Sequence, residues 1–358
     1  MKKTLIVAAV AASFATAASA QSSVTLYGLV DAGITYTSNV NGDVRWAQTS
    51  GAVQQSRWGL RGSEDLGGGL KAIFNLENGF NLNDGSLARS GRMFSRQAFV
   101  GLSSDFGTVT LGRQFDAAVD YLAPLSATGT WGGTYFAHPG DADNLNATNS
   151  SNNTVKFASA NYAGFTFGGT YSFSNEAGAF ANNRAYSAGA AYENQGLRVA
   201  AAYAQENNPN ADNSGASDGS FVAGNFRQRT FGVGAGYTLG AANVGLLWTQ
   251  TRLDNGASVR LNNYEVNGKY SFTPAMSAGL AYTFTDAQAS GAKNRVNQVG
   301  VQGDYALSRR TDVYAEAVYQ RVNGDEDGII PTAVINGAGG ASSTRNQGVA
   351  SVGLRHRF

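Results

Sequence analysis

The sequence predicts an all-β protein, a transmembrane antiparallel β-barrel of sixteen strands. Three observations predict it: apolar and polar residues alternate in many segments, most of these segments are about ten residues or longer, and short turns alternate with long polar loops between them. A tilted strand needs about 9–11 residues to cross a bilayer, whereas strands of globular proteins have about 5–6. Segment length therefore favours a membrane barrel over a soluble β-protein.

The first twenty residues have the pattern of a secretory signal peptide. Lys2 and Lys3 form the charged start, residues 5–17 are mostly apolar, and residues 18–20 are the small residues of a cleavage site. The apolar stretch is too short to span a membrane comfortably. We expect cleavage before Gln21, export through the periplasm, and a single barrel domain over residues 21–358.

The composition narrows the class of protein. The 358 residues include 46 Gly and only 5 Pro, but 16 Tyr, 19 Phe and 4 Trp argue against disorder. There is no cysteine, so no disulfide holds the exported chain together. Without Lys2 and Lys3, 24 basic residues stand against 25 acidic ones, a net charge of −1 that gives no reason to expect a nucleic-acid partner.

Strands are expected wherever the alternation occurs, in chain order. The sixteen segments are 23–36, 54–64, 68–80, 92–103, 107–115, 154–161, 164–174, 185–194, 196–206, 227–239, 242–252, 262–273, 275–286, 295–306, 311–322 and 345–358. Short turns lie at 65–69, 104–107, 162–164, 194–196, 240–242, 274 and 308–310. Long polar loops lie at 37–53, 81–91, 116–153, 175–184, 207–226, 253–261, 287–294 and 323–344. Outer-membrane barrels sort their connections in this way, with short turns in the periplasm and long loops outside.

The two faces of each strand differ in polarity. Tyr264 and Tyr270 lie on one face of their strand, whereas Glu265 and Lys269 lie on the other. We expect the apolar faces to contact lipid and the polar faces to surround a lumen. The barrel must close, because an open edge in hydrocarbon leaves backbone groups unpaired. Sixteen strands enclose more space than side chains fill, so the lumen is expected to be an aqueous channel.

Aromatic residues form two bands, one near each end of the strands. Such bands are typical of barrels at the two bilayer interfaces. The band near the short turns contains Phe106, Tyr162, Tyr192, Tyr237, Tyr270, Phe272 and Tyr305, and the other contains Phe80, Tyr171, Tyr203, Tyr282, Phe284 and Tyr319.

Four segments carry a resemblance to a known family. "SVTLYGLVDAGI", "SRWGLRGSEDLGGGLKAIFNLE", "RQAFVGLSSDFGTVTLGRQ" and the terminal "VGLRHRF" are similar to the general diffusion porins of Gram-negative outer membranes, in their neisserial and beta-proteobacterial branch. The resemblance implies a homotrimer in the outer membrane, with one pore per barrel for ions and small hydrophilic solutes. It also implies that the third external loop, 116–153, folds inward. Phe358 resembles the signal that the barrel-assembly machinery recognises.

The same resemblance implies a narrow point, or eyelet, where acidic groups of the third loop face basic groups of the wall. Such opposed charges set ion preference, and the resemblance leads us to expect a weak preference for anions here. The acidic candidates are Asp116 and Asp120, whose spacing of four would place both on one side of a helical turn. The basic candidates are Arg57, Arg96 and Lys156, and vestibule charges nearer the periplasmic turn are Arg61 and Lys71.

Other functions remain as alternatives. A substrate-specific channel could use Trp131 and Tyr135 in the third loop, and an adhesin or surface anchor could use the long loops without an open pore. An enzyme is disfavoured because the two histidines, His138 and His356, have no nucleophile motif beside them.

No catalytic residue, cofactor or metal site is predicted. The acidic clusters at 140–144 and 324–328 lack calcium-loop spacing. Lipopolysaccharide and outer-membrane lipid are expected neighbours of the barrel, with bridging divalent cations as an open alternative for the acidic clusters.

Overall fold

The computed structural model describes residues 22–358 except 90, 179, 209–214, 218–226 and 255–257. The predicted signal peptide, residues 1–20, lies outside the described residues. No helix in the described part of the chain has the length and apolar character needed to cross a membrane.

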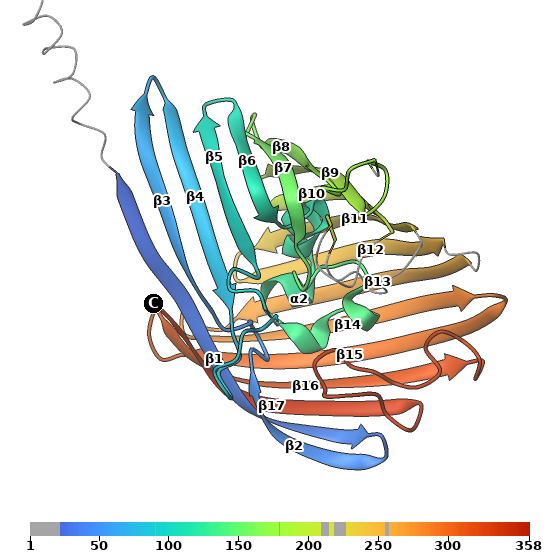
Figure 1. Ribbon diagram of the computed structural model, residues 1–358. Coiled ribbons are helices and arrows are strands. Elements are labelled where there is room, and N and C mark those ends of the chain that lie inside the picture. The colour runs from blue at the N-terminus through green and yellow to red at the C-terminus, as the bar shows by residue number, and fades with distance from the viewer. Residues whose placement is uncertain (1–21, 90, 179, 209–214, 218–226, 255–257) are drawn as a thin grey trace, which may run out of the picture.

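Strands make up most of the structure, and every pairing between them is antiparallel (Figure 1). The strands are β1 (Ser23–Val40), β2 (Asp43–Ser50), β3 (Arg57–Gly67), β4 (Leu70–Gly79), β5 (Gln97–Ser104), β6 (Gly107–Gln114), β7 (Ser151–Ser159), β8 (Phe165–Ser172), β9 (Arg184–Asn194), β10 (Leu197–Asn207), β11 (Arg227–Leu239), β12 (Ala242–Asp254), β13 (Ser258–Ser271), β14 (Met276–Ala289), β15 (Ala292–Ala306), β16 (Thr311–Gly324) and β17 (Asn346–Arg357).

The second strand position of the barrel is interrupted. β2 pairs with β1 from Ala32 to Val40, and β3 pairs with the same edge of β1 from Ser23 to Leu29. β2 and β3 therefore share one position, and residues 51–56 between them leave the sheet. The seventeen segments of the sheet thus fill sixteen positions, which confirms the predicted barrel.

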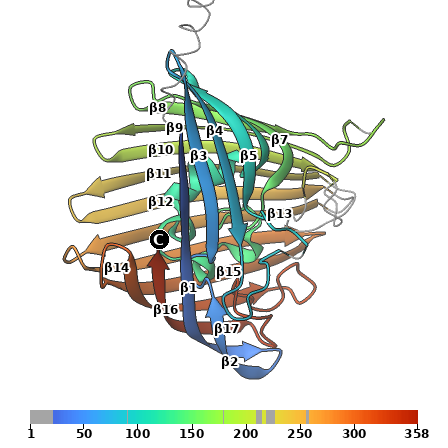
Figure 2. The same ribbon diagram turned by 60° about the vertical axis from the view of Figure 1, so that its left-hand side comes forward.

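The ring closes between β17 and β1. Their register runs from Leu29 opposite Arg357 to Thr37 opposite Val349. Beyond β17, Phe358 and Gly28 exchange two backbone hydrogen bonds of 3.1 and 3.0 Å. A Cβ at Gly28 would lie 2.6 Å from the Phe358 ring, so only glycine allows this approach. Figure 2 shows β1 and β17 beside one another at the closure.

Two predicted long loops are wrong. In the predicted loop 37–53, residues 37–50 form a hairpin instead, because β1 continues to Val40 and Asn41–Gly42 make a tight turn at φ of 55° and 112° before β2. Asn-Gly is the favoured two-residue hairpin turn. Residues 287–294 likewise contain only a tight turn, at Ser290–Gly291, between β14 and β15. The predicted loop 253–261 is shortened by β12 and β13, and its centre lies outside the described residues.

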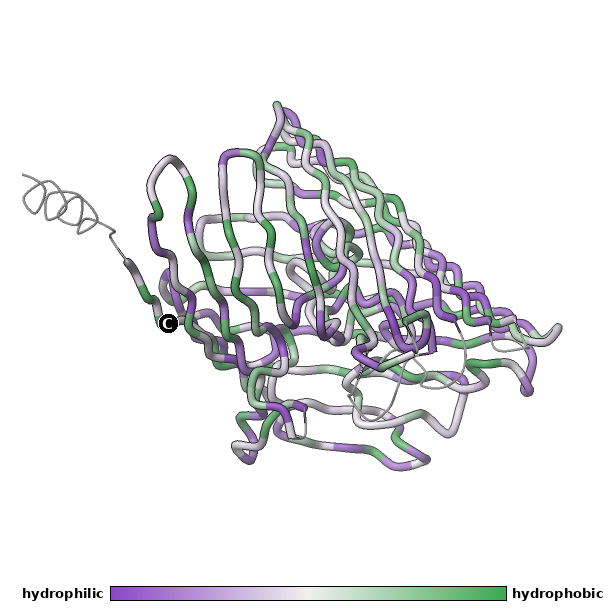
Figure 3. The backbone as a smooth tube through the Cα atoms, turned by 45° about the horizontal axis from the view of Figure 1, so that its top comes forward, coloured by the Kyte–Doolittle hydropathy of each residue, from purple (hydrophilic) through white to green (hydrophobic). Residues whose placement is uncertain are grey.

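The polarity of the barrel is the reverse of that in a soluble β-protein. Large apolar side chains such as Leu246 and Val244 are about 60% and 56% exposed on the outside. Polar side chains on the opposite face, such as Thr249 and Asn263, are fully buried. Figure 3 shows hydrophobic and hydrophilic positions alternating along the strands. This arrangement is the one expected of a barrel whose outer face contacts lipid.

Candidate functional site

The connection from β6 to β7 is built of short helical turns. They are η2 (Ala118–Leu122), η3 (Ala123–Leu125), α2 (Ala127–Thr130), η4 (Thr134–Phe136) and η5 (Pro139–Asp141). Ser126 caps α2, since its hydroxyl accepts a 3.0 Å hydrogen bond from the Gly129 N–H. Figure 1 shows α2 within the curve of the strands.

Apolar side chains of this connection pack against glycines of the barrel wall. A Cβ at Gly279 or at Gly300 would lie 2.5 Å from the ring of Trp131 or of Phe136, respectively. Gly232 on β11 makes the same room for Leu122. The glycine-rich face of β11, which sequence alternation already places inward, therefore accommodates the helical turns.

A buried ionic cluster joins the connection to β13. His138 Nδ1 lies 2.6 Å from an Asp143 oxygen, and His138 Nε2 lies 2.8 Å from a Glu265 oxygen. Glu265 also accepts a 2.7 Å hydrogen bond from the Ala127 N–H. Burial by itself lowers the pKa of His138, but Asp143 and Glu265 outweigh it and raise that pKa to about 10. The histidine is therefore a cation held between two carboxylates.

Asp141 lies beside this cluster with an unusual ionisation. Burial, followed by repulsion from Asp143, raises the pKa of Asp141 to about 7. One carboxyl oxygen accepts a 3.0 Å hydrogen bond from the Asn146 N–H, while the other has no hydrogen-bond partner among the described residues.

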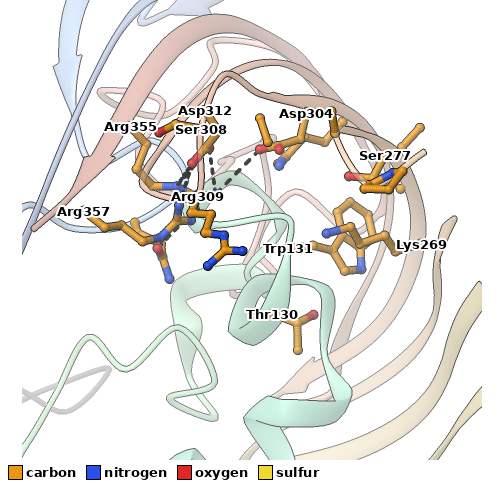
Figure 4. Close-up of a pocket in the computed structure, with 17 residues that line it drawn as sticks. Thr130, Trp131, Lys269, Ser277, Asp304, Ser308, Arg309, Asp312, Arg355 and Arg357 are labelled. Carbon is orange, nitrogen blue, oxygen red and sulfur yellow. Dashed lines mark hydrogen bonds and ion pairs between the residues drawn. The ribbon is translucent and has the colours of Figure 1, made fainter. Parts of the chain in front are cut away.

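Among the cavities of the described structure, one lies nearer the long loops and another nearer the short turns. The loop-side cavity has a volume of about 480 Å³ and is lined by Arg57, Arg89 and Arg96. Among the residues that the structure describes, no Asp or Glu lines it. The turn-side cavity has a volume of about 550 Å³ (Figure 4), and its charged lining residues are Lys269, Asp304, Arg309, Asp312, Arg355 and Arg357.

Gln54 and α2 contribute residues to both cavities. Gln54, in the interruption between β2 and β3, lines both cavities. Thr128 and Gly129 of α2 line the loop-side cavity, and Thr130 lines the turn-side cavity.

The structure brings Arg57 and Arg96 together on the wall. Both contact the carboxylate of Glu77, at 3.8 and 2.7 Å respectively. Arg96 also donates a 2.7 Å hydrogen bond to Gln55 Oε1 and lies over the ring of Phe115. Glu77 is not among the predicted site residues. Alternation places it on the polar face of its strand, but alternation does not tell which residues it contacts.

The acidic candidates lie elsewhere. Asp120 forms a 2.5 Å ion pair with Lys156, whose ammonium also donates to the Phe115 carbonyl at 3.1 Å. Asp116 accepts hydrogen bonds of 3.0 Å from the Val119 N–H and the Asn144 amide. The expected helical turn is present, since the Asp120 N–H donates to the Asp116 carbonyl. No ion pair within the described ranges joins either acid to Arg57 or Arg96, so the opposed-charge eyelet stays a prediction.

The predicted vestibule charges lie near the turn between β3 and β4. The Arg61 guanidinium lies 5.2 Å from the centre of the Tyr27 ring, and both Arg61 and Lys71 are exposed. Neither lines the loop-side or the turn-side cavity.

Comparison with known proteins identifies the family of this barrel. Residues 7–325 match the family described as Gram-negative porin. The chain belongs to this family. The porin is 32% identical over 410 residues to an outer membrane porin protein of Bordetella pertussis, with full coverage of both chains. It is 29% identical over 375 residues to the major outer membrane protein P.IB of Neisseria lactamica, again with full coverage.

A solved structure agrees with these relatives. The anion-selective porin from Comamonas acidovorans superposes on this porin with a TM-score of 0.75 at 29% identity, over 94% of this chain and 100% of that one. Family and fold together place the protein in the Gram-negative outer membrane. The family and the fold are those of a channel rather than of an enzyme.

Proposed function

We propose that this porin is an open pore for passive diffusion of ions and small hydrophilic solutes, with a preference for anions. One observation carries the preference: among the described residues, seven cationic side chains but only two carboxylates line the two cavities. The cationic residues are Arg57, Arg89, Arg96, Lys269, Arg309, Arg355 and Arg357, and the acidic ones are Asp304 and Asp312.

Local charge explains why a nearly neutral chain would prefer anions. Rings of charged side chains select ions of opposite sign because they raise the local concentration of those ions. The net charge of the whole protein has little influence, since exposed charges farther than about 8–10 Å from an ion are screened at ordinary salt. The printed name of the Comamonas relative, an anion-selective porin, supports this direction.

The helical connection 115–150 would narrow this pore. Its apolar packing on Gly232, Gly279 and Gly300 and its ionic link to Glu265 support an inward fold. Arg57 and Arg96 would supply the basic wall of the eyelet, as the family resemblance implies. Lys156 offsets the charge of Asp120, and the single carboxylate of Glu77 is shared by Arg57 and Arg96, so the two arginines keep an excess of positive charge.

The assembly belongs to the same proposal. We expect a homotrimer embedded in outer-membrane lipid and lipopolysaccharide, delivered by the barrel-assembly machinery through a signal that includes Phe358. The apolar outer face, with exposed residues such as Leu246, Val266 and Leu280, supports contact with lipid or with neighbouring barrels.

Conductance in a planar bilayer tests the function. The purified porin should give stable open channels that close in three equal steps, and a tenfold gradient of potassium chloride should give a reversal potential of the sign expected for chloride. Absence of conductance would contradict the pore and favour a surface anchor. A reversal potential of the opposite sign would contradict the anion preference alone.

A further inference from the structure

The interruption between β2 and β3 is a folded insert. Residues 51–56 leave the sheet, and Ala52 and Val53 become buried in the cluster that contains Trp131 and Tyr135. Strand residues would leave their side chains alternately in lipid and lumen, whereas these two consecutive residues are both covered. The insert therefore packs on the helical connection rather than on the membrane.

A buried aspartate holds the insert in place. Asp31 is fully buried, and one of its carboxyl oxygens accepts hydrogen bonds from the Val53 N–H at 3.1 Å and the Gln54 N–H at 2.7 Å. Its other oxygen accepts a 2.6 Å hydrogen bond from the Tyr314 hydroxyl. Ser56 completes the attachment, since its hydroxyl accepts a hydrogen bond from the Asp31 N–H and donates one to the Asp31 carbonyl. Charge-assisted bonds of this kind are among the stronger ones in proteins.

The insert also contacts the helical connection through its backbone. The Thr134 N–H donates a 3.0 Å hydrogen bond to the Ala52 carbonyl. Gly133, at a φ of 68°, lies so close that a Cβ there would be 2.4 Å from the Val53 Cα. The insert and the connection thus meet without space for a larger residue at position 133.

We infer that residues 51–56 form a second insert that borders the eyelet, beside the helical connection, and that half-buried Gln54 is a specificity-determining residue of the pore. The inference rests on the proposed pore function. Its geometric basis is that Gln54 lines both cavities and that α2 also contributes residues to each of them.

Neighbouring groups fix the amide of Gln54. Its Oε1 accepts a 3.1 Å hydrogen bond from Arg355, and Arg355 is itself held by Asp312 at 2.9 Å. A neutral amide therefore stands between the arginines of the loop-side cavity and those of the turn-side cavity. We expect an ion that moves from one cavity to the other to pass this side chain, so that a charge placed there acts at short range.

Substitution of Gln54 tests this inference in bilayer recordings. Gln54→Glu keeps the size of the side chain and adds a negative charge beside the ion path. We expect the chloride-to-potassium permeability ratio to fall at least about fivefold, the effect of a unit charge about 4 Å from the ion even in a water-like medium. Gln54→Ala should raise single-channel conductance and keep the anion preference. Circular dichroism confirms that each variant is folded.

Gln195→Glu provides a matched control. Gln195 is exposed in the tight turn between β9 and β10 and lines neither cavity. This variant should leave the permeability ratio unchanged within about a factor of two, because water and salt screen a charge at the rim.

The outcomes separate the two proposals. If the unmodified porin conducts with anion preference and Gln54→Glu gives the same ratio as Gln195→Glu, the role of Gln54 is wrong. If the unmodified porin does not conduct, the pore function itself is wrong. A conducting Gln54→Glu porin with a lowered ratio supports both.

Discussion

Replacement of His138 by alanine should release the helical connection from the barrel wall. His138 links the carboxylates of Asp143 and Glu265, and all three side chains are fully shielded from solvent. The substitution removes the cation and leaves two buried negative charges near one another. The strands themselves keep their pairing, so the effect should concentrate in residues 115–150.

The structure sets the size of this effect. Removing one partner of a buried ion pair costs about 3–5 kcal/mol. Each carboxylate keeps other donors, since Asp143 still bonds Thr249 and Asn263, and Glu265 still bonds Ala127 and Asn267. We therefore expect the lower end, about 3 kcal/mol, which corresponds to roughly a hundredfold change in an equilibrium constant.

Amide hydrogen exchange measured by mass spectrometry reports this opening. Peptides from residues 115–150 should exchange roughly a hundredfold faster in His138→Ala, whereas peptides from β11 to β16 should not change. His356→Gln is the control, because the other histidine bonds only Thr311 at the barrel rim among the residues described. Exchange within about threefold of the unmodified protein in residues 115–150 would refute the proposed link.

Four further predictions concern charge. Arg96→Ala removes a cation that lines the loop-side cavity, so the reversal potential in a salt gradient should shift toward potassium; no shift would remove Arg96 from the filter. Asp120→Asn frees Lys156 and should shift the same measurement toward chloride. The raised pKa of His138 means that its protonated form stabilises the fold, fully below about pH 6.5 and no longer once pH rises through about 10. The free energy of unfolding should show this pH dependence in the parent protein and lack it in His138→Gln. Burial raises the pKa of Asp141 to about 7, so folding disfavours the ionised form of this carboxyl group. The free energy of unfolding of Asp141→Asn should therefore exceed that of the parent above about pH 7 and equal it near about pH 3.

Alternation predicted the barrel because it depends only on neighbours in the chain. The observed β11, Arg227–Leu239, has the predicted bounds, and its polarity follows from lipid on one side and the lumen on the other. The errors at 37–53 and 287–294 arose where polar residues continue a strand beyond the bilayer. In both segments the dipeptide that makes the tight turn, Asn41–Gly42 or Ser290–Gly291, could have indicated a hairpin.

The site was less predictable because it depends on distances between remote segments. Alternation could place Arg57 on the lumen side, and family motifs could select Arg96, but neither reveals that Glu77 lies between them. The link from His138 to Glu265 joins residues 127 positions apart. No local pattern encodes such a contact, and the insert at 51–56 was hidden within a segment expected to be partly loop and partly strand.

The two edges of β1 find their partners at very different distances along the chain. One edge meets β2 and β3, which follow directly in the chain, whereas the other waits for β17, more than three hundred positions later. Until then the first strand presents a row of open N–H and C=O groups, the kind of surface on which chains aggregate. A periplasmic carrier that shields this edge, or holds the chain unfolded, would therefore protect the chain until the ring closes.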